Sequence, residues 1–439
     1  MSGDLSREAL PWRPPEELVP QLAQAFGRDG LSWLDGDGSP LGRRAVVGLR
    51  PEETLLCEGL PGSPGARNPF ALLAELVGSG ERWLAWLAYE AGAWVEPAEH
   101  WQSPRLPVLR ACRHDALLHF DLAERTLQLE GRPQALRRWR EPVRELLETR
   151  PVPPPAEPAI PQEAWQWLTP PERFREQVGQ LRQLIAAGDL FQANLTACRR
   201  AERARPPDPL ALYLRLRRRC PAPFSGLMVS GEHAVLSTSM ERFLQVSATG
   251  QVETRPIKGT RPRAADPIAD ADAAAELVCS PKDRAENVMI VDLMRHDLGR
   301  LCRPGSIRVP QLVGLESYAR VHHLTSVVRG ELAAGHAAAA LLRACWPPGS
   351  ISGAPKIRAC QRLNELEPIA RGPYCGSFLL CNGDGSLDSN VLIRSVMVQG
   401  RHLQAHAGCG IVADSDPSAE ARELEWKLQP LLDALAADA

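Results

Sequence analysis

The stretch Gly188-Asp189-Leu190-Phe191-Gln192-Ala193-Asn194-Leu195-Thr196 joins a helical pattern to a strand-like one. On its N-terminal side, Thr169-Pro170-Pro171-Glu172 is typical of a helix start, with a threonine cap, proline in the first turn and a capping-box glutamate. Apolar residues then recur at helical spacing, at Val178, Leu181, Leu184 and Ile185. Gly188 is suited to ending that helix, and the apolar run after it is typical of a strand. The sequence therefore predicts a helix followed directly by a strand.

A proline-rich segment divides the chain. Arg150-Pro151-Val152-Pro153-Pro154-Pro155-Ala156-Glu157-Pro158 holds too many prolines for a helix or a central strand. Before it, the pattern predicts a strand at Trp83–Glu90 and a helix at Gln134–Glu148. We therefore distinguish an N-terminal region at residues 1–150, a linker at residues 151–164 and a C-terminal region at residues 165–435.

Composition excludes several classes of partner. The chain has 439 residues and a formal net charge of −2, so neither nucleic acid nor an anionic membrane is expected as its main partner. No apolar stretch approaches the roughly 20 residues of a membrane span. The eleven cysteines are scattered and form no Cys-x-x-Cys pair, which is typical of reduced packing thiols. These features predict a cytoplasmic protein.

Two segments each place acidic residues on one helical face. Asp283 and Glu286 lie three residues apart in a stretch of helical character, and further on Glu420, Glu423 and Lys427 recur at helical spacing. Carboxylates that converge from two helices suit Mg²⁺, which prefers oxygen ligands and keeps several waters. Taken alone, each group is more often an ordinary solvated acidic face. The pattern by itself therefore leaves both interpretations open.

Several segments, all in one order along the chain, resemble the chorismate-using enzymes and, among them, the aminodeoxychorismate synthases of the component I type. The resemblance covers roughly residues 165 to 430. Besides Gly188–Thr196 it is carried by Ser239–Phe243, Pro256–Thr260, Glu286–Arg300, His323-Leu324, Pro348–Lys356, Tyr374–Ser377 and Ala407–Pro417. It implies an α+β sandwich with two large antiparallel sheets in the middle and helices outside. It also implies that the N-terminal region adds strands to the same body and that the C-terminal region is catalytic.

One lysine distinguishes two reactions within this superfamily. Between Pro-Ile and Gly-Thr, anthranilate synthases carry alanine, whereas aminodeoxychorismate synthases typically carry lysine; here the residue is Lys258. The resemblance implies that Lys258 is a nucleophile, which requires an unprotonated amine in a desolvated pocket. Outside this motif, a strand lysine facing water would be the ordinary interpretation. Glu241 is expected as the general acid that protonates the departing C4 hydroxyl, with its pKa raised by burial.

The resemblance also assigns residues to substrate and metal. Isochorismate and salicylate synthases carry a lysine base where this chain has Gln192, and a neutral amide cannot be that base, which favours amination. His323 is expected to assist proton transfer or to fix the ring, although a core histidine with satisfied hydrogen bonds is nearly as compatible. The expected substrate-binding residues are Gln192, Gly259, Thr260, Ser350, Gly353, Tyr374, Arg394, Gly408, Gly410 and Lys427. The expected Mg²⁺ residues are Glu286 and Glu423, with Glu420 acting through water, and Asp283.

The source of ammonia is expected to be another chain. No cysteine lies in a Gly-x-Cys-x-Gly turn with a downstream His-x-Glu, so a separate glutamine amidotransferase subunit is the expected partner, with chorismate as substrate. Two alternatives stay open. One is an anthranilate synthase component I, which aminates chorismate at C2 and eliminates pyruvate. The other is a non-catalytic subunit that binds chorismate or the amidotransferase.

Overall fold

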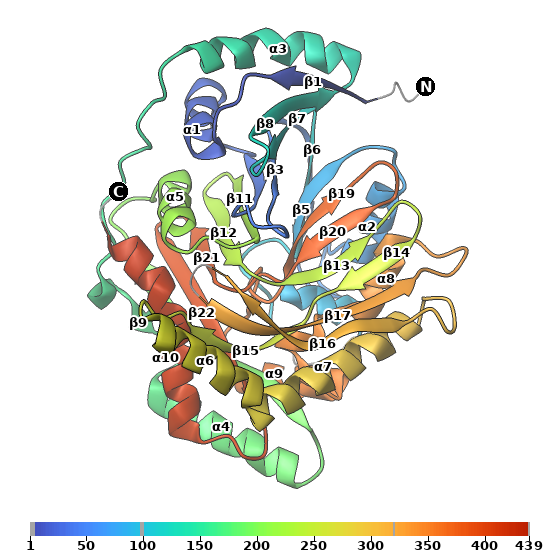
Figure 1. The fold of residues 1–439 in the computed structure, drawn as a ribbon, viewed down its shortest axis with the longest axis vertical. Helices are drawn as coiled ribbons and strands as arrows, with labels where there is room; N and C mark the ends of the chain where they lie inside the picture. Colours follow the sequence, from blue (N-terminus) through green and yellow to red (C-terminus); the bar gives the residue numbers. More distant parts are fainter. Residues whose placement is uncertain (1–4, 97–100, 319–320, 438–439) are drawn as a thin grey trace.

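Two large antiparallel sheets form the body of the protein, with helices on the outside (Figure 1). The computed structural model describes residues 5–96, 101–318 and 321–437. Its architecture confirms the α+β sandwich expected from the sequence. No helix within these ranges combines the length and the apolar character needed to cross a membrane.

The larger sheet has twelve strands in the described residues. Along the sheet they follow the order β1 (Ser6–Leu10), β8 (Thr126–Gly131), β7 (Ala116–Asp121), β3 (Arg44–Gly48), β2 (Ser32–Asp35), β11 (Phe224–Ser230), β12 (His233–Ser239), β21 (Ser395–Gln399), β22 (His402–Ile411), β10 (Gln192–Glu202) and β18 (Gly353–Ala354). A short strand, β9 (Gln166–Trp167), pairs with β10 off this path. The strand predicted after Gly188 is β10.

The smaller sheet has ten strands in the same ranges. Their order is β15 (Ile257–Pro262), β17 (Val321–Glu331), β14 (Gln251–Thr254), β13 (Arg242–Val246), β20 (Leu387–Asn390), β19 (Ser377–Cys381), β5 (Trp83–Leu87), β6 (Leu109–His114) and β4 (Pro51–Cys57). β16 (Arg308–Ser317) and β15 both pair with His322 and His323 of β17, so they lie on opposite sides of that strand. β16 and β4 are therefore edge strands at opposite ends of the sheet.

Residues before the proline-rich segment belong to both sheets. β2 pairs with β11 in the larger sheet, and β5 pairs with β19 in the smaller one. Residues 151–161 form neither helix nor strand and connect α3 (Pro133–Glu148) to the short 3₁₀ turn η2 (Gln162–Ala164). The segment thus links parts of one two-sheet body.

Helix starts follow a common chemistry. Five helices have proline in the first turn and a capping side chain that accepts backbone N–H bonds, which satisfies otherwise unpaired donors. These helices and their caps are α2 (Pro69–Val77) with Asn68, α5 (Pro209–Arg219) with Asp208, α6 (Pro267–Cys279) with Asp266, α7 (Pro281–Gly299) with Ser280, and α10 (Pro417–Ala436) with Asp416. The other helical segments are α1 (Pro15–Phe26), η1 (Tyr89–Trp94), α4 (Pro171–Ala186), α8 (Ala338–Cys345), η3 (Gly349–Ile351) and α9 (Lys356–Leu366).

The predicted threonine cap of α4 is wrong. The cap residue is Pro170, which makes no side-chain capping hydrogen bond, and Thr169 is buried one position earlier. Two consecutive prolines place the helix start one residue later than the Thr169 pattern predicts, because the residue before a proline is driven out of the helical region. The predicted end is confirmed, since the helix stops at Ala186 and Gly188 follows with φ of +78°.

Alternate residues of the larger sheet face two different apolar layers, as the two-residue period of a strand requires. In β11, Leu227 packs into the layer that contains residues of α1, α4, α5 and α10, whereas Met228 packs into the layer between the sheets. In β12 the same division separates Leu236 from Val235. Phe243 of the smaller sheet lies in the second layer, so the two sheets pack face to face.

Candidate active site

Gly410 on β22 lies beside three residues that are distant from it in the sequence, namely Gln192, Glu286 and Lys258. A β-carbon added at Gly410 would lie 2.5 Å from Gln192 Nε2, 3.2 Å from Glu286 Oε2 and 3.3 Å from Lys258 Nζ. The absence of a side chain at this position is therefore what lets the other three approach. They come from β10, α7 and β15, so both sheets and one helix build the site. The structure brings together three residues expected at substrate or chemistry and one expected at the metal.

The strand that carries Lys258 is irregular. β15 shifts its register against β17 between Ile257 and Thr260, and Gly259 has φ of +83°. A β-carbon on Gly259 would lie 2.9 Å from Asp283 Cβ, so α7 packs directly against the bulge. Burial lowers the pKa of Lys258, while the Glu286 carboxylate opposes that shift. Burial thus increases the fraction of unprotonated amine, which is the form that a nucleophile requires.

Glu241 is buried directly after β12. Its backbone N–H donates to Ser239 Oγ at 3.2 Å, and its carbonyl accepts from the Val391 N–H at 3.0 Å, so the turn that holds the side chain is fixed. Burial raises the pKa of Glu241 to about 7, although the Ser350 hydroxyl and the Lys258 amine act in the opposite direction. A carboxyl with that pKa can hold a proton near neutral pH and release it to a leaving group.

His323 lies on β17 opposite Thr260. Its Nδ1 is 2.8 Å from Thr260 Oγ1, and its Nε2 is buried without a hydrogen-bond partner among the described residues. Burial, together with the positive charge of Arg394, lowers the pKa of His323 to about 3. The ring is therefore neutral at neutral pH. The neutral ring can orient a substrate through Nε2. It cannot act as a general acid, because the protonated form is not populated at neutral pH.

Glutamine 192 begins β10 and is almost fully buried. Both its Oε1 and its Nε2 lack a hydrogen-bond partner in the described part of the chain. A buried amide with both ends free is costly unless something else binds it. Its place beside Gly410 therefore marks a polar binding position within the site.

Three carboxylates from α7 and α10 lie around two lysines. Glu423 is 2.7 Å from Lys427 Nζ, and Lys282 Nζ lies 3.0 Å from Glu420 and 4.0 Å from Glu286. Burial alone would lower the pKa of Lys427, but the Glu423 carboxylate beside it raises that pKa. Burial raises the pKa of Glu286, and Lys258 opposes this shift. The cluster is thus a mixture of acids and amines in which Glu420 is buried, whereas Lys282, Glu423 and Lys427 are partly exposed.

The carboxylate set fits a hard divalent cation. Ligand atoms of Cys409, Glu420 and Glu423 lie within 4.8 Å of one another. Glu420 Oε1 accepts from Ser415 Oγ and Lys282, whereas Glu420 Oε2 is buried and has no partner in the described ranges. A buried, unpaired carboxylate oxygen beside a second carboxylate is a suitable ligand position for Mg²⁺.

Asp283, also expected at the metal, makes a different contact. Its carboxylate lies 3.1 Å from Arg261 Nη2, beside the Gly259 bulge. Among the described residues, the group of ligand atoms within 4.8 Å of one another includes neither Asp283 nor Glu286. The i, i+3 spacing from Glu286 correctly put both residues on α7, but it did not anticipate the arginine on β15.

The remaining residues expected at substrate surround α10 and β22. Arg394 has φ of +51° and donates through Nη1 to the Lys427 carbonyl. Lys427 Nζ donates to the Gly408 carbonyl at 2.8 Å, and Tyr374 stacks on His406 with ring centroids 5.1 Å apart. Burial lowers the pKa of Arg394. Its other guanidinium donors remain suited to a carboxylate, so its substrate role stays a prediction.

Backbone packing explains the glycines of the site. A β-carbon on Gly408 would lie 2.7 Å from Asn194 Nδ2, and one on Gly353 would overlap the Gln192 carbonyl. Both glycines therefore let neighbouring strands approach β10. The sequence motifs gave the positions of these glycines but not these neighbours.

One buried ion pair was not anticipated from the sequence. Arg371 and Glu367 are both nearly inaccessible to solvent and lie four residues apart, just beyond the end of α9 at Leu366. Neither belongs to a segment that carried the resemblance. The spacing of four residues between opposite charges was the available signal, and it is common on exposed helices.

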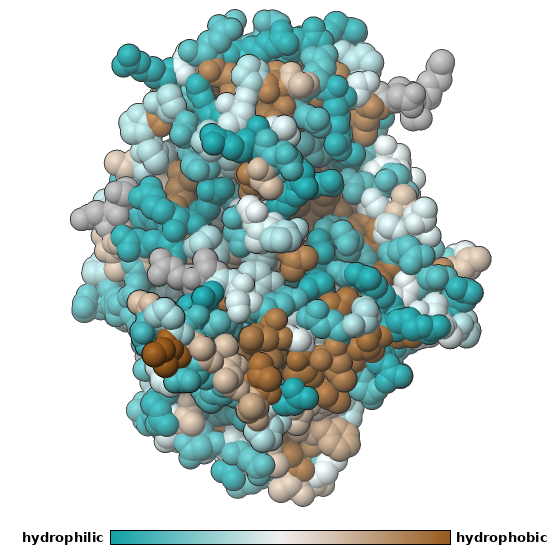
Figure 2. All heavy atoms as spheres, in the orientation of Figure 1, coloured by the Kyte–Doolittle hydropathy of each residue, from teal (hydrophilic) through white to brown (hydrophobic). Residues whose placement is uncertain are grey.

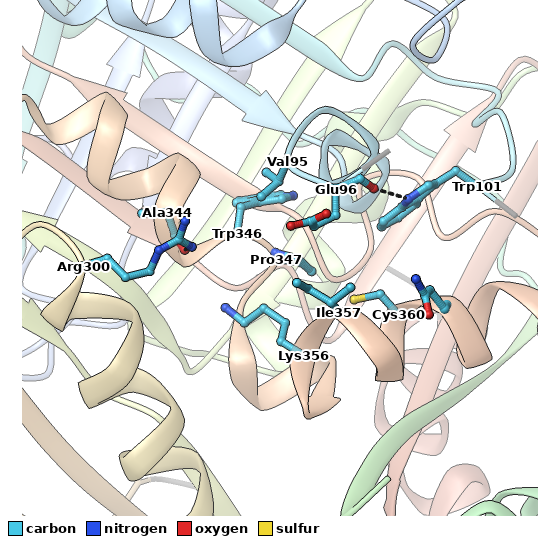
Figure 3. A pocket seen from close by; sticks show the side chains of 12 residues that line it. Val95, Glu96, Trp101, Arg300, Ala344, Trp346, Pro347, Lys356, Ile357 and Cys360 are labelled. Atoms are coloured by element: carbon cyan, nitrogen blue, oxygen red, sulfur yellow. Dashed lines mark hydrogen bonds between the residues drawn. The ribbon is translucent and has the colours of Figure 1, made fainter. Parts of the chain in front are cut away.

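A separate pocket lies beside α8 and the start of α9 (Figure 3). Lys356 lines it, but its Nζ is bound to Asp297 and to the Cys345 carbonyl. No residue predicted to bind substrate or metal lines this pocket; its lining residues include Val95, Trp101, Arg300, Trp346, Pro347 and Ile357.

Comparisons with known proteins agree with this geometry. Residues 62–433 match the family model described as chorismate binding enzyme. Over 272 residues, the chain is 45% identical to aminodeoxychorismate synthase component 1 of Klebsiella aerogenes, which covers 62% of this chain and 60% of that protein. It is 46% identical over 266 residues to anthranilate synthase component 1 of Streptomyces coelicolor, covering 60% and 51% respectively. The chain thus spans about 60% of the first of these relatives and about half of the second.

The fold has a counterpart among solved structures. Anthranilate synthase component I of Streptococcus pneumoniae superposes with a TM-score of 0.77 at 27% identity, covering 89% of this chain and 92% of that one. Because the likeness covers 89% of this chain, it includes most of the N-terminal region, which the sequence motifs do not reach.

Proposed function

The chain belongs to the chorismate binding enzyme family, and from that premise we propose that it aminates chorismate at C4 to give 4-amino-4-deoxychorismate. The observation that carries the proposal is the position of Lys258 Nζ beside Gly410, Gln192 and Glu286. An amine whose pKa is lowered by burial, and which lies at Gly410 with the Gln192 amide and the Glu286 carboxylate, has the properties of a nucleophile.

In the first step, the unprotonated Lys258 amine adds to C2 of the ring. The double bonds shift, the C4–O bond breaks, and Glu241 gives its proton to the hydroxyl, which departs as water. The new secondary amine loses one proton. The raised pKa of Glu241 supports this role, because a carboxyl that is largely ionised at neutral pH could not supply the proton.

In the second step, ammonia adds at C4 and the bond between C2 and Lys258 breaks. The ring double bonds shift back, the electron pair of the broken bond returns to the lysine nitrogen, and that nitrogen takes up the proton that the added ammonia loses, so the product carries an amino group at C4. The neutral Gln192 amide supports amination rather than addition of water at C2, because it cannot serve as a base.

The dianionic substrate would be bound partly by positively charged side chains and partly by a metal ion. Glu286, Glu423 and Glu420 would hold Mg²⁺, which when bound neutralises the ring carboxylate. Arg394 would take a carboxylate through guanidinium nitrogens other than Nη1, which donates to the Lys427 carbonyl. Neutral His323, fixed by Thr260, would orient the ring through Nε2. Ammonia would come from a partner chain, as the component 1 designation of the Klebsiella relative suggests.

A second candidate is anthranilate synthase component I. The 46% identity to the Streptomyces coelicolor protein favours keeping it. Lys258 argues against it, because the resemblance associates alanine at this position with that reaction.

The test is incubation of the purified chain with chorismate, Mg²⁺ and ammonium chloride. The proposed enzyme gives aminodeoxychorismate, which yields p-aminobenzoate only when a lyase is added. Fluorescent anthranilate formed without any addition would identify the second candidate. Unchanged chorismate would indicate a non-catalytic subunit.

A further inference from the structure

Strand β17 carries two buried polar side chains with unused hydrogen-bonding groups. His323 Nε2 and Thr325 Oγ1 are both buried and lack a partner among the described residues. Thr325 is only 1% exposed, so bulk water does not solvate its hydroxyl. Its backbone carbonyl, by contrast, accepts a hydrogen bond from Gln311 Nε2 at 3.0 Å. A buried hydroxyl without a partner is costly, and beside a binding site it marks a position that a ligand completes.

The side chains of His323 and Thr325 lie on the same face of the sheet. Side chains alternate along a strand, so these two share a face and lie about 7 Å apart. On β15, Thr260 is opposite His323 and bonded to its ring, and Ile257 is opposite Thr325. Lys258 lies in the bulge between these two pairing points. The hydroxyl of Thr325 is therefore close to the strand segment that carries the proposed nucleophile.

Helices close the other face of β17. Ser326 Oγ donates to Asn287 Oδ1 of α7, and Leu324 packs with Leu277 of α6. Figure 2 shows that hydrophobic residues gather on the outside of this layer, over α6, α7 and β16. The unused polar groups of His323 and Thr325 are thus on the face turned away from these helices, which is the face of the candidate active site.

Thr325 lies at the end of the site where Glu241 is proposed to act. Its cross-strand neighbour Ile257 has a backbone N–H that acts to lower the pKa of the Glu241 carboxyl. Residues directly opposite each other on antiparallel strands have β-carbons about 4.5–5.5 Å apart. In the proposed reaction Glu241 protonates the C4 hydroxyl, which is the one neutral hydroxyl of chorismate. A threonine hydroxyl can donate a hydrogen bond to that oxygen and can accept one from it.

We propose that Thr325 Oγ1 hydrogen-bonds the substituent at C4 of the substrate, first the hydroxyl that departs and then the ammonia that replaces it. The inference rests on the proposed amination of chorismate and adds a substrate-contacting residue to it. In the first step Thr325 donates to the C4 oxygen while Glu241 transfers its proton to that oxygen, so Thr325 keeps its own proton. In the second step Oγ1 accepts a hydrogen bond from ammonia, whose lone pair stays free to add at C4.

The experiment compares two variants at this position with a matched control. Thr325→Val removes the hydroxyl and nearly keeps the shape of the side chain, whereas Thr325→Ser keeps the hydroxyl. The control is Thr254→Val, because Thr254 is also buried but pairs with Val328, on the helix side of the sheet. Chorismate binding is measured by calorimetry without ammonium, and the KM for ammonium is measured in turnover with chorismate and Mg²⁺. Thermal unfolding of each free protein is recorded.

In Thr325→Val we expect chorismate to bind about tenfold more weakly and the KM for ammonium to rise about tenfold, because the C4 substituent loses a partner. Thr325→Ser and Thr254→Val should stay within about threefold of the wild type in both quantities. The melting temperature of free Thr325→Val should equal or exceed that of the wild type, because the substitution removes a buried hydroxyl that has no partner in the described residues.

The inference is overturned if either chorismate binding or the KM for ammonium is unchanged in Thr325→Val. A lower melting temperature of Thr325→Val also overturns it, since the hydroxyl would then support the fold of the free protein. Wild-type protein that binds chorismate but forms no product with ammonium refutes the proposed function instead. The binding comparison between wild type and Thr325→Val then still decides whether Thr325 contacts the substrate.

Discussion

Arg371 donates hydrogen bonds to both carboxylate oxygens of Glu367, at 2.7 and 2.8 Å, in the interior of the protein. The same guanidinium donates to the carbonyls of Ile351 and Asn194, at 2.8 and 2.7 Å. Glu367 in turn accepts the Thr196 N–H at 2.9 Å. The pair thus ties η3, where Ser350 lies, to the strand that begins at Gln192.

Removing Arg371 should destabilise the fold strongly. Arg371→Met leaves Glu367 buried without its partner, and we expect a loss of about 3–5 kcal/mol in the free energy of unfolding, measured by urea denaturation. The matched control is Arg303→Met, which breaks the exposed pair with Glu331 and should cost less than about 1 kcal/mol. Equal losses in the two variants would contradict the central role of the Arg371 pair.

Filling the space at Gly410 should strongly reduce activity. In Gly410→Ala the new methyl group would lie within 3.3 Å of Gln192, Glu286 and Lys258, so these groups must move apart. We expect ammonium-dependent turnover to fall by about a hundredfold, because misplacement of about 1 Å can have that effect. Gly179→Ala is the control: it lies in α4 with nothing within 4 Å. This control should keep its turnover and gain about 0.5–1 kcal/mol of stability.

Lysine 258 should be indispensable. Lys258→Met keeps the length of the side chain but removes the amine, and we expect turnover to fall by several orders of magnitude. Without ammonia, wild-type protein quenched after mixing with chorismate should show an added mass on the peptide that contains Lys258. Wild-type turnover in Lys258→Met, or an adduct in that variant, would rule out the nucleophilic role.

Activity should fall as pH rises through the pKa of Glu241. The general acid must be protonated, and burial raises the pKa of Glu241 to about 7, so kcat/KM should decline above that pH. Glu241→Gln should lower turnover and lose this alkaline limb. If the limb persists unchanged in Glu241→Gln, another group is responsible.

The raised pKa of Glu241 also predicts how the free energy of unfolding depends on pH. The effect is opposite to that of a salt bridge, which lowers the pKa of its carboxylate. Between pH 4.5 and about 7 the unfolded carboxyl ionises while the folded one keeps its proton, so stability falls as pH rises across this window. Glu241→Gln should therefore be more stable than the wild type at pH 8, with a smaller difference at pH 4. Urea denaturation at the two pH values measures this; a larger gain at pH 4 would contradict it.

Magnesium should stabilise the protein through α10. Added Mg²⁺ is expected to raise the melting temperature of the wild type, because a ligand that binds the native state stabilises it. Glu423→Gln and Glu420→Gln should lose this shift. Asp283→Asn should keep it, since Asp283 is paired with Arg261. If Asp283→Asn also loses the rise in melting temperature with Mg²⁺, Asp283 is a metal ligand.

Local patterns identified much of the fold and of the site. The segments with helical spacing became α3, α4, α7 and α10, and Glu420 and Glu423 do lie together on one of them. Such spacing is readable because residues three or four apart on a helix are neighbours whatever surrounds them. The residue at which a helix starts was harder to predict. The pattern indicated Thr169 as the cap of α4, but two successive prolines follow it and the cap is Pro170.

The sequence by itself determined which chemical groups the protein has available: a lysine before a glycine in a strand, a second strand beginning at Gln192, and acids on two helices. Only the tertiary structure decided which of them touch. The bulge in β15, the approach of Gln192 and Lys258 to Gly410, the pairing of Asp283 with Arg261 and the burial of Arg371 all join residues far apart in the chain. Contacts of that kind, and the pKa values that burial sets, depend on how two sheets and their helices pack, and no local spacing encodes that packing.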